Sequence, residues 1–304
     1  MESLPPVKRA ANRNVYPNPY PLFDLATPTS IKTGGIPVEK ITVVYASTRA
    51  EAVETAKRLE SYLENHKIQH AVMPLSDFDR LQSPPTDGVL MVLGGDGTML
   101  RATRRVTSPE IAVVGVNYGR AGYLCQIQPS ELNDAIEKII TGDFQVDKVL
   151  RLTIYLGERS VGDILNEVYL SSKRPGRIIE YNVSQDDLSL VDVADGLIVA
   201  TPIGSTAYAL SAGGPAVHEG VDAMVVVPLA SMTNLRPMVV PSTIPLKVVV
   251  SKGEPQILVD GHTAYDVGSS VISVVKSNNS LNFLRLKGQV MFSRRLRKRL
   301  YGRA

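Results

Sequence analysis

Strand-like and helix-like segments alternate over the first half of the chain, and this alternation is the strongest constraint on the fold. Apolar, β-branched runs mark strands, and amphipathic runs between them mark helices. The run at 88–95 is apolar on both faces, as in a strand buried between helix layers. These segments predict an open α/β domain with a mostly parallel sheet. Strands are expected at 41–47, 68–75, 88–95 and 110–117, and helices at 48–66, 97–106 and 129–142.

The pattern changes at Gln145, where strand-like runs follow one another with almost no helix between them. One predicted helix, starting near Ser205, interrupts the series, so we expect a β-rich second domain. The apolar run at 281–286 precedes a short basic segment that we expect to return to the first domain. The chain then divides into an extended N-terminal arm (1–38), the α/β domain (39–143), the β-rich domain (144–285) and a basic C-terminal segment (286–304).

Composition excludes several classes of protein. The net charge of +3 requires no polyanionic partner, so we expect no nucleic acid. No apolar stretch approaches the roughly 20 residues that span a bilayer, and no signal-peptide pattern is present, so we expect no membrane partner. The single cysteine, Cys125, excludes a disulfide framework and favours a cytoplasmic location. The scattered histidines identify no metal ligands.

The segment "MVLGGDGTML" (91–100) combines a strand, a glycine turn and a helix start, which is typical of a phosphate cradle. Gly94, Gly95, Gly97 and Thr98 would bring phosphate oxygens close to the main chain at the end of a strand. Asp96 interrupts this cradle, because a carboxylate repels phosphate. It fits as a general base that takes the proton from an attacking hydroxyl. The alternative is a tight turn in which small residues and a cap begin the helix.

Two further segments combine polar residues with buried strands. "DGLIVATPIGSTAYALSAGGP" (195–215) places hydroxyl and small residues at a helix start that follows a strand. A well-capped helix is the alternative to a binding site there. Asn166 and Glu167 lie inside the apolar run "ILNEVYL", where polar side chains are costly unless they are paired or bind a ligand. A bulge or turn is the alternative for this pair.

In this order, "GGDGT", "NE" and "DGLIVATPIGSTAYALSAGGP" resemble the NAD kinases, and the resemblance covers the chain from Ile41 to its C-terminus. "GGDGT" alone is shared with diacylglycerol and sphingosine kinases and with phosphofructokinases, whereas "TPIGSTAY" after an upstream "NE" is more specific. The resemblance implies an α/β domain followed by a β-rich domain. It also implies phosphorylation of NAD to NADP by ATP or polyphosphate, with Mg²⁺ or another divalent cation, in a homo-oligomer (a dimer or a tetramer).

The resemblance also implies roles for individual residues. Asp96 would be the base on the adenosine ribose 2′-hydroxyl, with Gly97 beside it, and Arg101 would lie near the pyrophosphate. Asn166 and Glu167 would contact a ribose of NAD. Further NAD contacts would come from Arg177, Asp195, Thr206, Ala207, Tyr208, Ala209, Leu210, Ser211, Ala230 and His262, and the phosphates of ATP would lie on Gly94, Gly95, Gly97 and Thr98.

The sequence departs from the family pattern at three places. "PLASMTNLRP" is short and lacks a Pro-His pair that many relatives have, Ala194 stands where some bacterial members have arginine, and His262 replaces a frequent glutamine. These changes bear on subunit contacts and on specificity at the phosphate side.

Three other interpretations compete with a NAD kinase. A lipid kinase would share the first motif, but no amphipathic membrane segment supports it. A non-catalytic NAD(P)-binding regulator would have no need of the base Asp96. The basic tail "RRLRKRLYGR" could bind nucleic acid, but a helix with Leu296 and Leu300 on its inner face accounts for it better.

Overall fold

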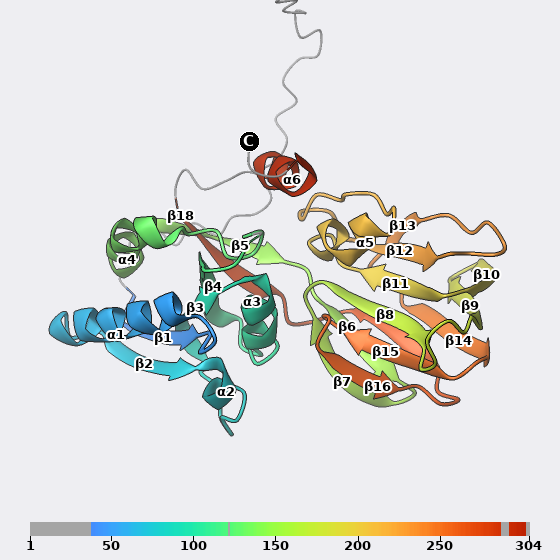
Figure 1. Cartoon of the computed structure of the whole chain (residues 1–304), viewed down its shortest axis with the longest axis horizontal. Coiled ribbons are helices and arrows are strands. Elements are labelled where there is room, and N and C mark those ends of the chain that lie inside the picture. Colours follow the sequence, from blue (N-terminus) through green and yellow to red (C-terminus); the bar gives the residue numbers. More distant parts are fainter. Residues whose placement is uncertain (1–37, 121, 287–291, 302–304) are drawn as a thin grey trace, which may run out of the picture.

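The computed structural model describes residues 38–120, 122–286 and 292–301. These residues form two domains that lie side by side, with the C-terminal helix above the junction between them (Figure 1). The N-terminal arm expected at 1–38 lies, except for Val38, outside the described residues.

A six-stranded sheet organises the N-terminal domain, in the order β2-β1-β3-β4-β18-β5. Neighbouring strands are parallel, except that β5 runs antiparallel to β18. The carboxyl ends of β3 and β4 therefore open at one edge, where open α/β sheets bind their ligands. The strands are β1 (Lys40–Tyr45), β2 (Gln69–Pro74), β3 (Asp87–Gly94), β4 (Glu110–Asn117), β5 (Phe144–Val149) and β18 (Leu281–Leu286).

Helices cover both faces of this sheet, and the predicted α/β domain is confirmed. On one face α1 and α4 pack through Leu63 and Ile136, and on the other α2 and α3 pack through Phe78 and Met99. No helix in the described part of the chain is long and apolar enough to cross a membrane. The helices are α1 (Ala50–Asn65), α2 (Leu75–Phe78), α3 (Asp96–Thr103), η1 (Pro129–Glu131) and α4 (Leu132–Ile140).

Two six-stranded antiparallel sheets form the C-terminal domain, as predicted for its β-rich sequence. Their orders are β10-β9-β14-β17-β6-β7 and β13-β12-β11-β8-β15-β16. The two sheets share one apolar core. The strands are β6 (Leu152–Leu156), β7 (Arg159–Ile164), β8 (Glu167–Ser172), β9 (Ile179–Gln185), β10 (Leu188–Ala194), β11 (Gly196–Ala200), β12 (Ala223–Leu229), β13 (Met238–Pro241), β14 (Leu246–Lys252), β15 (Pro255–Val259), β16 (Thr263–Asp266) and β17 (Ile272–Lys276).

The boundary between the domains differs from the predicted division at residue 144. Strand β5 and all but the last residue of β18 fall within the range 144–285 that was assigned to the β-rich domain, yet both strands belong to the first sheet. The chain thus leaves the first domain after β5 and returns to it with β18. The physical reason is that β4 is a buried strand whose free edge needs a partner, and β18 supplies it together with buried Phe283 and Leu284.

Two helices also differ from their predictions. The helix expected near Ser205 is divided into η2 (Gly204–Thr206) and the single turn α5 (Tyr208–Ser211), because Ala207 between them has non-helical backbone angles. The C-terminal helix α6 (Phe292–Tyr301) does not bury Leu300, which is 51% exposed. Its buried residue is Arg295, which finds an acidic partner at the domain junction.

Replacing Phe283 by alanine tests the position of β18. The side chain is 1% exposed, so its truncation should lower the free energy of unfolding by about 3–5 kcal/mol. Urea denaturation of the parent and of Phe283→Ala measures the difference. Val249→Ala, at a strand position that is 44% exposed, is the control and should change stability by less than about 0.5 kcal/mol. An equally small change at Phe283 would contradict the burial of β18.

Candidate active site

A small pocket lies between the two domains, next to the carboxyl ends of β3 and β4. Four predicted site residues from three separate segments, Asp96, Asn166, and the adjacent Thr206 and Ala207, meet in it. Its volume of about 130 Å³ is below the ~300 Å³ of typical ligand sites, so it has room for only one part of a large ligand. The full lining consists of Asp96, Tyr123, Leu124, Asn166, Ile203, Thr206, Ala207 and Arg299.

Asp96 is the first residue of α3 and lies directly after the buried strand β3. Its carboxylate accepts three backbone N–H groups: Tyr123 at 3.0 Å on Oδ2, and Leu124 at 2.9 Å and Cys125 at 3.2 Å on Oδ1. A carboxylate has about four acceptor positions, so Oδ2 retains one for a ligand hydroxyl. Asp96 therefore fixes the loop that forms one wall of the pocket and still faces the pocket.

The glycine turn is closely packed. A Cβ on Gly94 would lie 2.5 Å from Thr98 Oγ1, so only glycine allows the threonine to fold back over the end of β3. Across the domain junction, the carbonyl oxygen of Gly97 lies 3.2 Å from His262 Nε2. The predicted phosphate residues thus form one turn at the start of α3, with His262 of the other domain against it. Such a helix start presents N–H groups to anions.

Asp260 holds Asn166 and Glu167 in place. Its carboxylate accepts the backbone N–H groups of Leu165 (3.0 Å), Asn166 (2.8 Å) and Glu167 (3.2 Å). A Cβ on Gly204 would lie 2.1 Å from the carbonyl oxygen of Asn166, so glycine is required where the start of η2 approaches the turn before β8. Asn166 is therefore positioned by its backbone, and its side chain reaches the pocket.

Glu167 is buried next to Asp260. The pKa of the Glu167 carboxyl is raised to about 8, mainly by burial and additionally by the negative charge of Asp260, while the Tyr208 backbone N–H partly offsets both effects. Burial also raises the pKa of Asp260, against the lowering effect of its three backbone N–H bonds. Asp260 has the bonds that stabilise a charge, so Glu167 is the protonated member of the pair at neutral pH. The buried Glu167 Oε2 has no hydrogen-bond partner among the described residues.

The segment 206–211 follows the pocket wall. Thr206 Oγ1 donates to the carbonyl oxygen of Ile203 at 3.0 Å. Tyr208 is 43% exposed and meets Tyr169 edge to face, with 5.5 Å between ring centroids. Ala209 is buried in the core behind the segment. Leu210 is half-buried and Ser211 is exposed.

Besides Gly97, Glu167, His262 and the segment 208–211, four more predicted NAD contacts are not part of the pocket lining. Arg101, on α3, forms an ion pair with Asp79, and Arg177 lies in the turn between β8 and β9. Asp195 and Ala230 lie at the start of β11, whereas Thr201 follows its end. The backbone N–H of Asp195 donates there to the carbonyl oxygen of Leu229. The length of β11 puts them about 17 Å from the pocket end of that strand.

Sequence reasoning missed five residues of the site. Tyr123, Leu124 and Ile203 are apolar or aromatic wall residues, and no residue-type signal distinguishes them from core positions. Asp260 stands in "LVDGH", where only His262 had been considered, and an acid after a buried strand was an available signal. Arg299 was part of the basic tail, and its spacing of four from Arg295 was the available signal for a shared helix face.

The described residues contain no group of three or more His, Cys, Asp or Glu side chains that could hold a metal ion. Asp96 is the single acid among those lining the pocket. The site therefore offers one carboxylate at most to a cation.

Comparison with known proteins identifies the family. The ATP-NAD kinase N-terminal domain model matches residues 38–144, and the ATP-NAD kinase C-terminal domain model matches residues 165–286. The NAD kinase of Methanopyrus kandleri is 38% identical over 209 residues, which are 68% of this chain and 75% of that protein. The NAD kinase of Thermococcus kodakarensis is 38% identical over 225 residues, or 72% and 78% of the two chains.

A solved structure agrees with these relatives. The crystal structure of an NAD kinase from Archaeoglobus fulgidus in complex with ATP has a TM-score of 0.70 and 25% identity, covering 86% of this chain and 97% of that one. The chain belongs to the NAD kinase family. The resemblance inferred from the three motifs is thereby confirmed, and it is favoured over the lipid-kinase interpretation.

The protonation of Glu167 gives the stability of the protein a pH dependence. Its pKa is about 8 in the folded protein, against an ordinary value of 4.5. Between these values the folded state binds more protons than the unfolded state, so stability falls as pH rises through this window. Glu167→Gln abolishes this effect, so the variant should lose less stability than the parent between pH 5 and pH 8.

Urea denaturation of both proteins at the two pH values measures this difference. Glu137→Gln, on the exposed face of α4, is the control and should behave as the parent does. The same pH dependence in the parent and in Glu167→Gln would mean that Glu167 is ionised in the folded protein.

Proposed function

We propose that this NAD kinase transfers the γ-phosphoryl group of ATP to the 2′-hydroxyl of the adenosine ribose of NAD, giving NADP and ADP, in the pocket between its domains. The observation that carries the proposal is the position of Asp96. It lies at the end of a glycine turn, in an interdomain pocket, with an acceptor position still open on its carboxylate.

The phosphoryl transfer needs a proton acceptor beside the ribose hydroxyl. The ribose oxygen forms a bond to the γ-phosphorus while the bond between that phosphorus and the β–γ bridging oxygen breaks, and ADP leaves with the electron pair. The hydroxyl proton passes to the Asp96 carboxylate. Because most of the negative charge stays on the phosphoryl oxygens, positioning and electrostatic stabilisation supply most of the catalysis.

The two domains bind different parts of the substrates. The turn Gly94, Gly95, Gly97 and Thr98, at the start of α3, binds phosphates of ATP through its main chain. The adenosine of NAD lies against Asn166, Glu167 and the segment 206–211, with the exposed ring of Tyr208 available for stacking. His262 lies beside Gly97, where it contacts NAD. Protonated Glu167 is able to donate a hydrogen bond, which an ionised carboxylate cannot do.

In the proposed reaction Mg²⁺ binds together with ATP. Mg²⁺ retains several waters and binds mainly to the phosphates of ATP, with few protein ligands, which fits the single carboxylate of this pocket. ATP is the donor that we propose, with inorganic polyphosphate as the other candidate.

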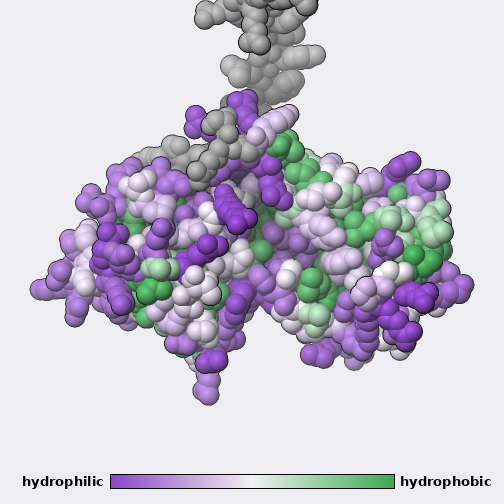
Figure 2. Space-filling view, in the orientation of Figure 1, coloured by the Kyte–Doolittle hydropathy of each residue, from purple (hydrophilic) through white to green (hydrophobic). Residues whose placement is uncertain are grey.

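We further propose that the enzyme acts in the cytoplasm and as a homo-oligomer. The lone cysteine, Cys125, is a buried free thiol, which suits a reducing compartment. The C-terminal domain exposes large apolar residues: Val191 at 59%, Met232 at 67% and Val239 at 47%. Apolar colour gathers on the outer side of that domain (Figure 2). A surface of this kind suits contact with another subunit.

Asp96→Asn tests the role of the base. The variant keeps the size of the side chain and removes the proton acceptor, so kcat should fall by about 10²–10⁴-fold. NADP formation from NAD, ATP and Mg²⁺, read with an NADP-specific dehydrogenase, gives kcat, and calorimetric titration gives the affinity for NAD.

Asp96 also holds the loop at 123–125, so loss of activity alone is ambiguous. A role limited to structure would weaken NAD binding together with kcat, whereas a base should leave the affinity for NAD within a few-fold of the parent. Asp87→Asn is the control, because this exposed acid begins β3, the strand that leads to Asp96, and pairs with Lys40. A kcat for Asp96→Asn within a few-fold of the parent would refute the base assignment.

A further inference from the structure

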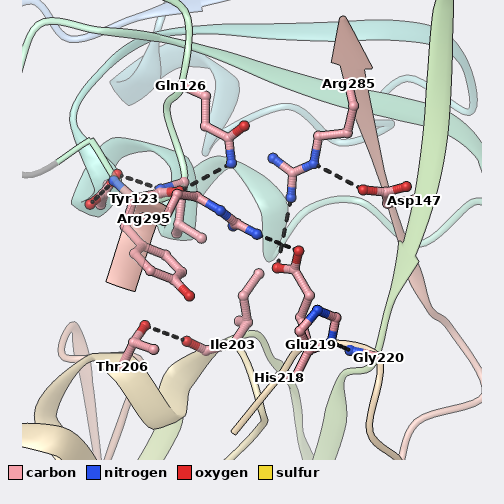
Figure 3. Close-up of polar contacts among 12 residues, drawn as sticks. Tyr123, Gln126, Asp147, Ile203, Thr206, His218, Glu219, Gly220, Arg285 and Arg295 are labelled. Carbon is pink, nitrogen blue, oxygen red and sulfur yellow. Dashed lines mark hydrogen bonds and ion pairs between the residues drawn. The ribbon is translucent and has the colours of Figure 1, made fainter. Parts of the chain in front are cut away.

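The C-terminal helix α6 lies across the domain junction and is held by contacts along its length. The ring of Phe292 lies 4.9 Å from that of His218, centroid to centroid. Arg295 forms an ion pair with Glu219, and its guanidinium lies 4.9 Å from the centroid of the Tyr123 ring (Figure 3). The helix therefore contacts both domains, and its Arg295 packs against a wall residue of the active site.

The anchor of α6 is a cluster of charged side chains around the buried Arg295. Arg295 is 5% exposed, and its partner Glu219 lies 3.9 Å from a second guanidinium, that of Arg285 on β18. Arg285 also pairs with Asp147 on β5, 3.3 Å away (Figure 3). A buried guanidinium without its partner is strongly destabilising. Arg295 therefore has one favourable position, and this fixes the placement of α6.

One helical turn after this anchor, Arg299 reaches the active site. Its Nε donates to the carbonyl oxygen of Thr206 at 3.2 Å, and it is the only basic residue among the described residues that line the pocket. That single bond orients the guanidinium, and within the described part of the chain its two terminal nitrogens have no partner. The pocket thus contains one carboxylate, Asp96, and one guanidinium with donors still available.

We propose that Arg299 binds phosphate oxygens of the nucleotides that react in this pocket. The proposal rests on the proposed function. The reacting phosphoryl group is anionic and must approach Asp96, an anion, so a cation beside them lowers the electrostatic cost. The planar fork of a guanidinium matches phosphate geometry and is able to bind two oxygens at once. Arg101, which the sequence had favoured for a phosphate, is paired with Asp79 instead.

Two phosphate sources are available to Arg299, namely the phosphoryl group that ATP transfers and the pyrophosphate of NAD. A contact with the transferred group is strongest in the transition state, so its loss lowers kcat and leaves both KM values nearly unchanged. A contact with the NAD pyrophosphate is present in the ground state, so its loss raises the KM for NAD.

Steady-state kinetics of four full-length proteins test the proposal: the parent, Arg299→Ala, Arg299→Lys and Arg297→Ala. Arg297 is an exposed cation on the same helix and is not part of the pocket lining. It is therefore the matched control for charge and helix content. Thermal unfolding without nucleotide shows that each variant is folded, and the exposed position of Arg299 at the end of α6 leaves the buried Arg295 intact.

We expect Arg299→Ala to lower kcat/KM for NAD by about 10²–10³-fold. Arg299→Lys should recover part of this loss, because it restores the charge without the fork, and added guanidinium ion should partly rescue Arg299→Ala. Arg297→Ala should stay within twofold of the parent.

Two results would overturn the proposal. One is an Arg299→Ala variant within threefold of the parent, and the other is a variant more active than the parent, which would mean that Arg299 blocks the pocket. A parent that forms no NADP from NAD and ATP would refute the proposed function itself, and this is measured before any variant is compared.

Discussion

The bonds between the Asp96 carboxylate and the backbone N–H groups at 123–125 are the interaction on which the rest of the active site depends. They join the start of α3 to the loop after β4, so the two segments that emerge from adjacent parallel strands become one surface. The aromatic wall residue Tyr123 is positioned by this contact, and Arg295 of α6 packs on its ring. A single carboxylate therefore organises its own surroundings and remains available to a substrate hydroxyl.

In the other domain, the opposite half of the pocket is also held by a carboxylate that accepts backbone N–H groups. Asp260 accepts three consecutive backbone N–H groups and so presents Asn166 to the pocket. Contacts between the halves are made just after Asp260: His262 lies on Gly97, and Arg104, the residue after α3, donates to Thr263 at the start of β16 at 2.5 Å. Each domain thus contributes one turn whose acid accepts three backbone N–H groups, and the proposed substrate site lies between the two turns.

Much of this arrangement could be predicted from the sequence, because its determinants are local. The apolar run of β3 and the glycines after it specify a strand, a turn and a helix start, and the order of the three motifs specifies the family. The membership of β5 and β18 in the first sheet could not be predicted, because the partner of a strand depends on contacts distant in sequence.

The pocket position of Arg299 could not be predicted for the same reason. A run of basic residues at the end of a chain is most often solvated, and only the acidic partner Glu219 reveals that one face of α6 is buried. Because the sequence does not show this partner, Leu296 and Leu300 were predicted to form the inner face of the helix. Leu300 is exposed instead.

The central claim is that Asp96 faces the hydroxyl that becomes phosphorylated. NADP has a phosphate on that oxygen, with a charge near −1.5 to −2 at neutral pH, and in the same pose this charge lies against the Asp96 carboxylate. Calorimetric titration of NAD and NADP into the parent and into Asp96→Asn, without ATP, measures the resulting penalty. The account predicts that Asp96→Asn binds NADP more tightly relative to NAD than the parent does. An unchanged ratio of the two affinities would mean that the hydroxyl does not face Asp96, and it would contradict the account.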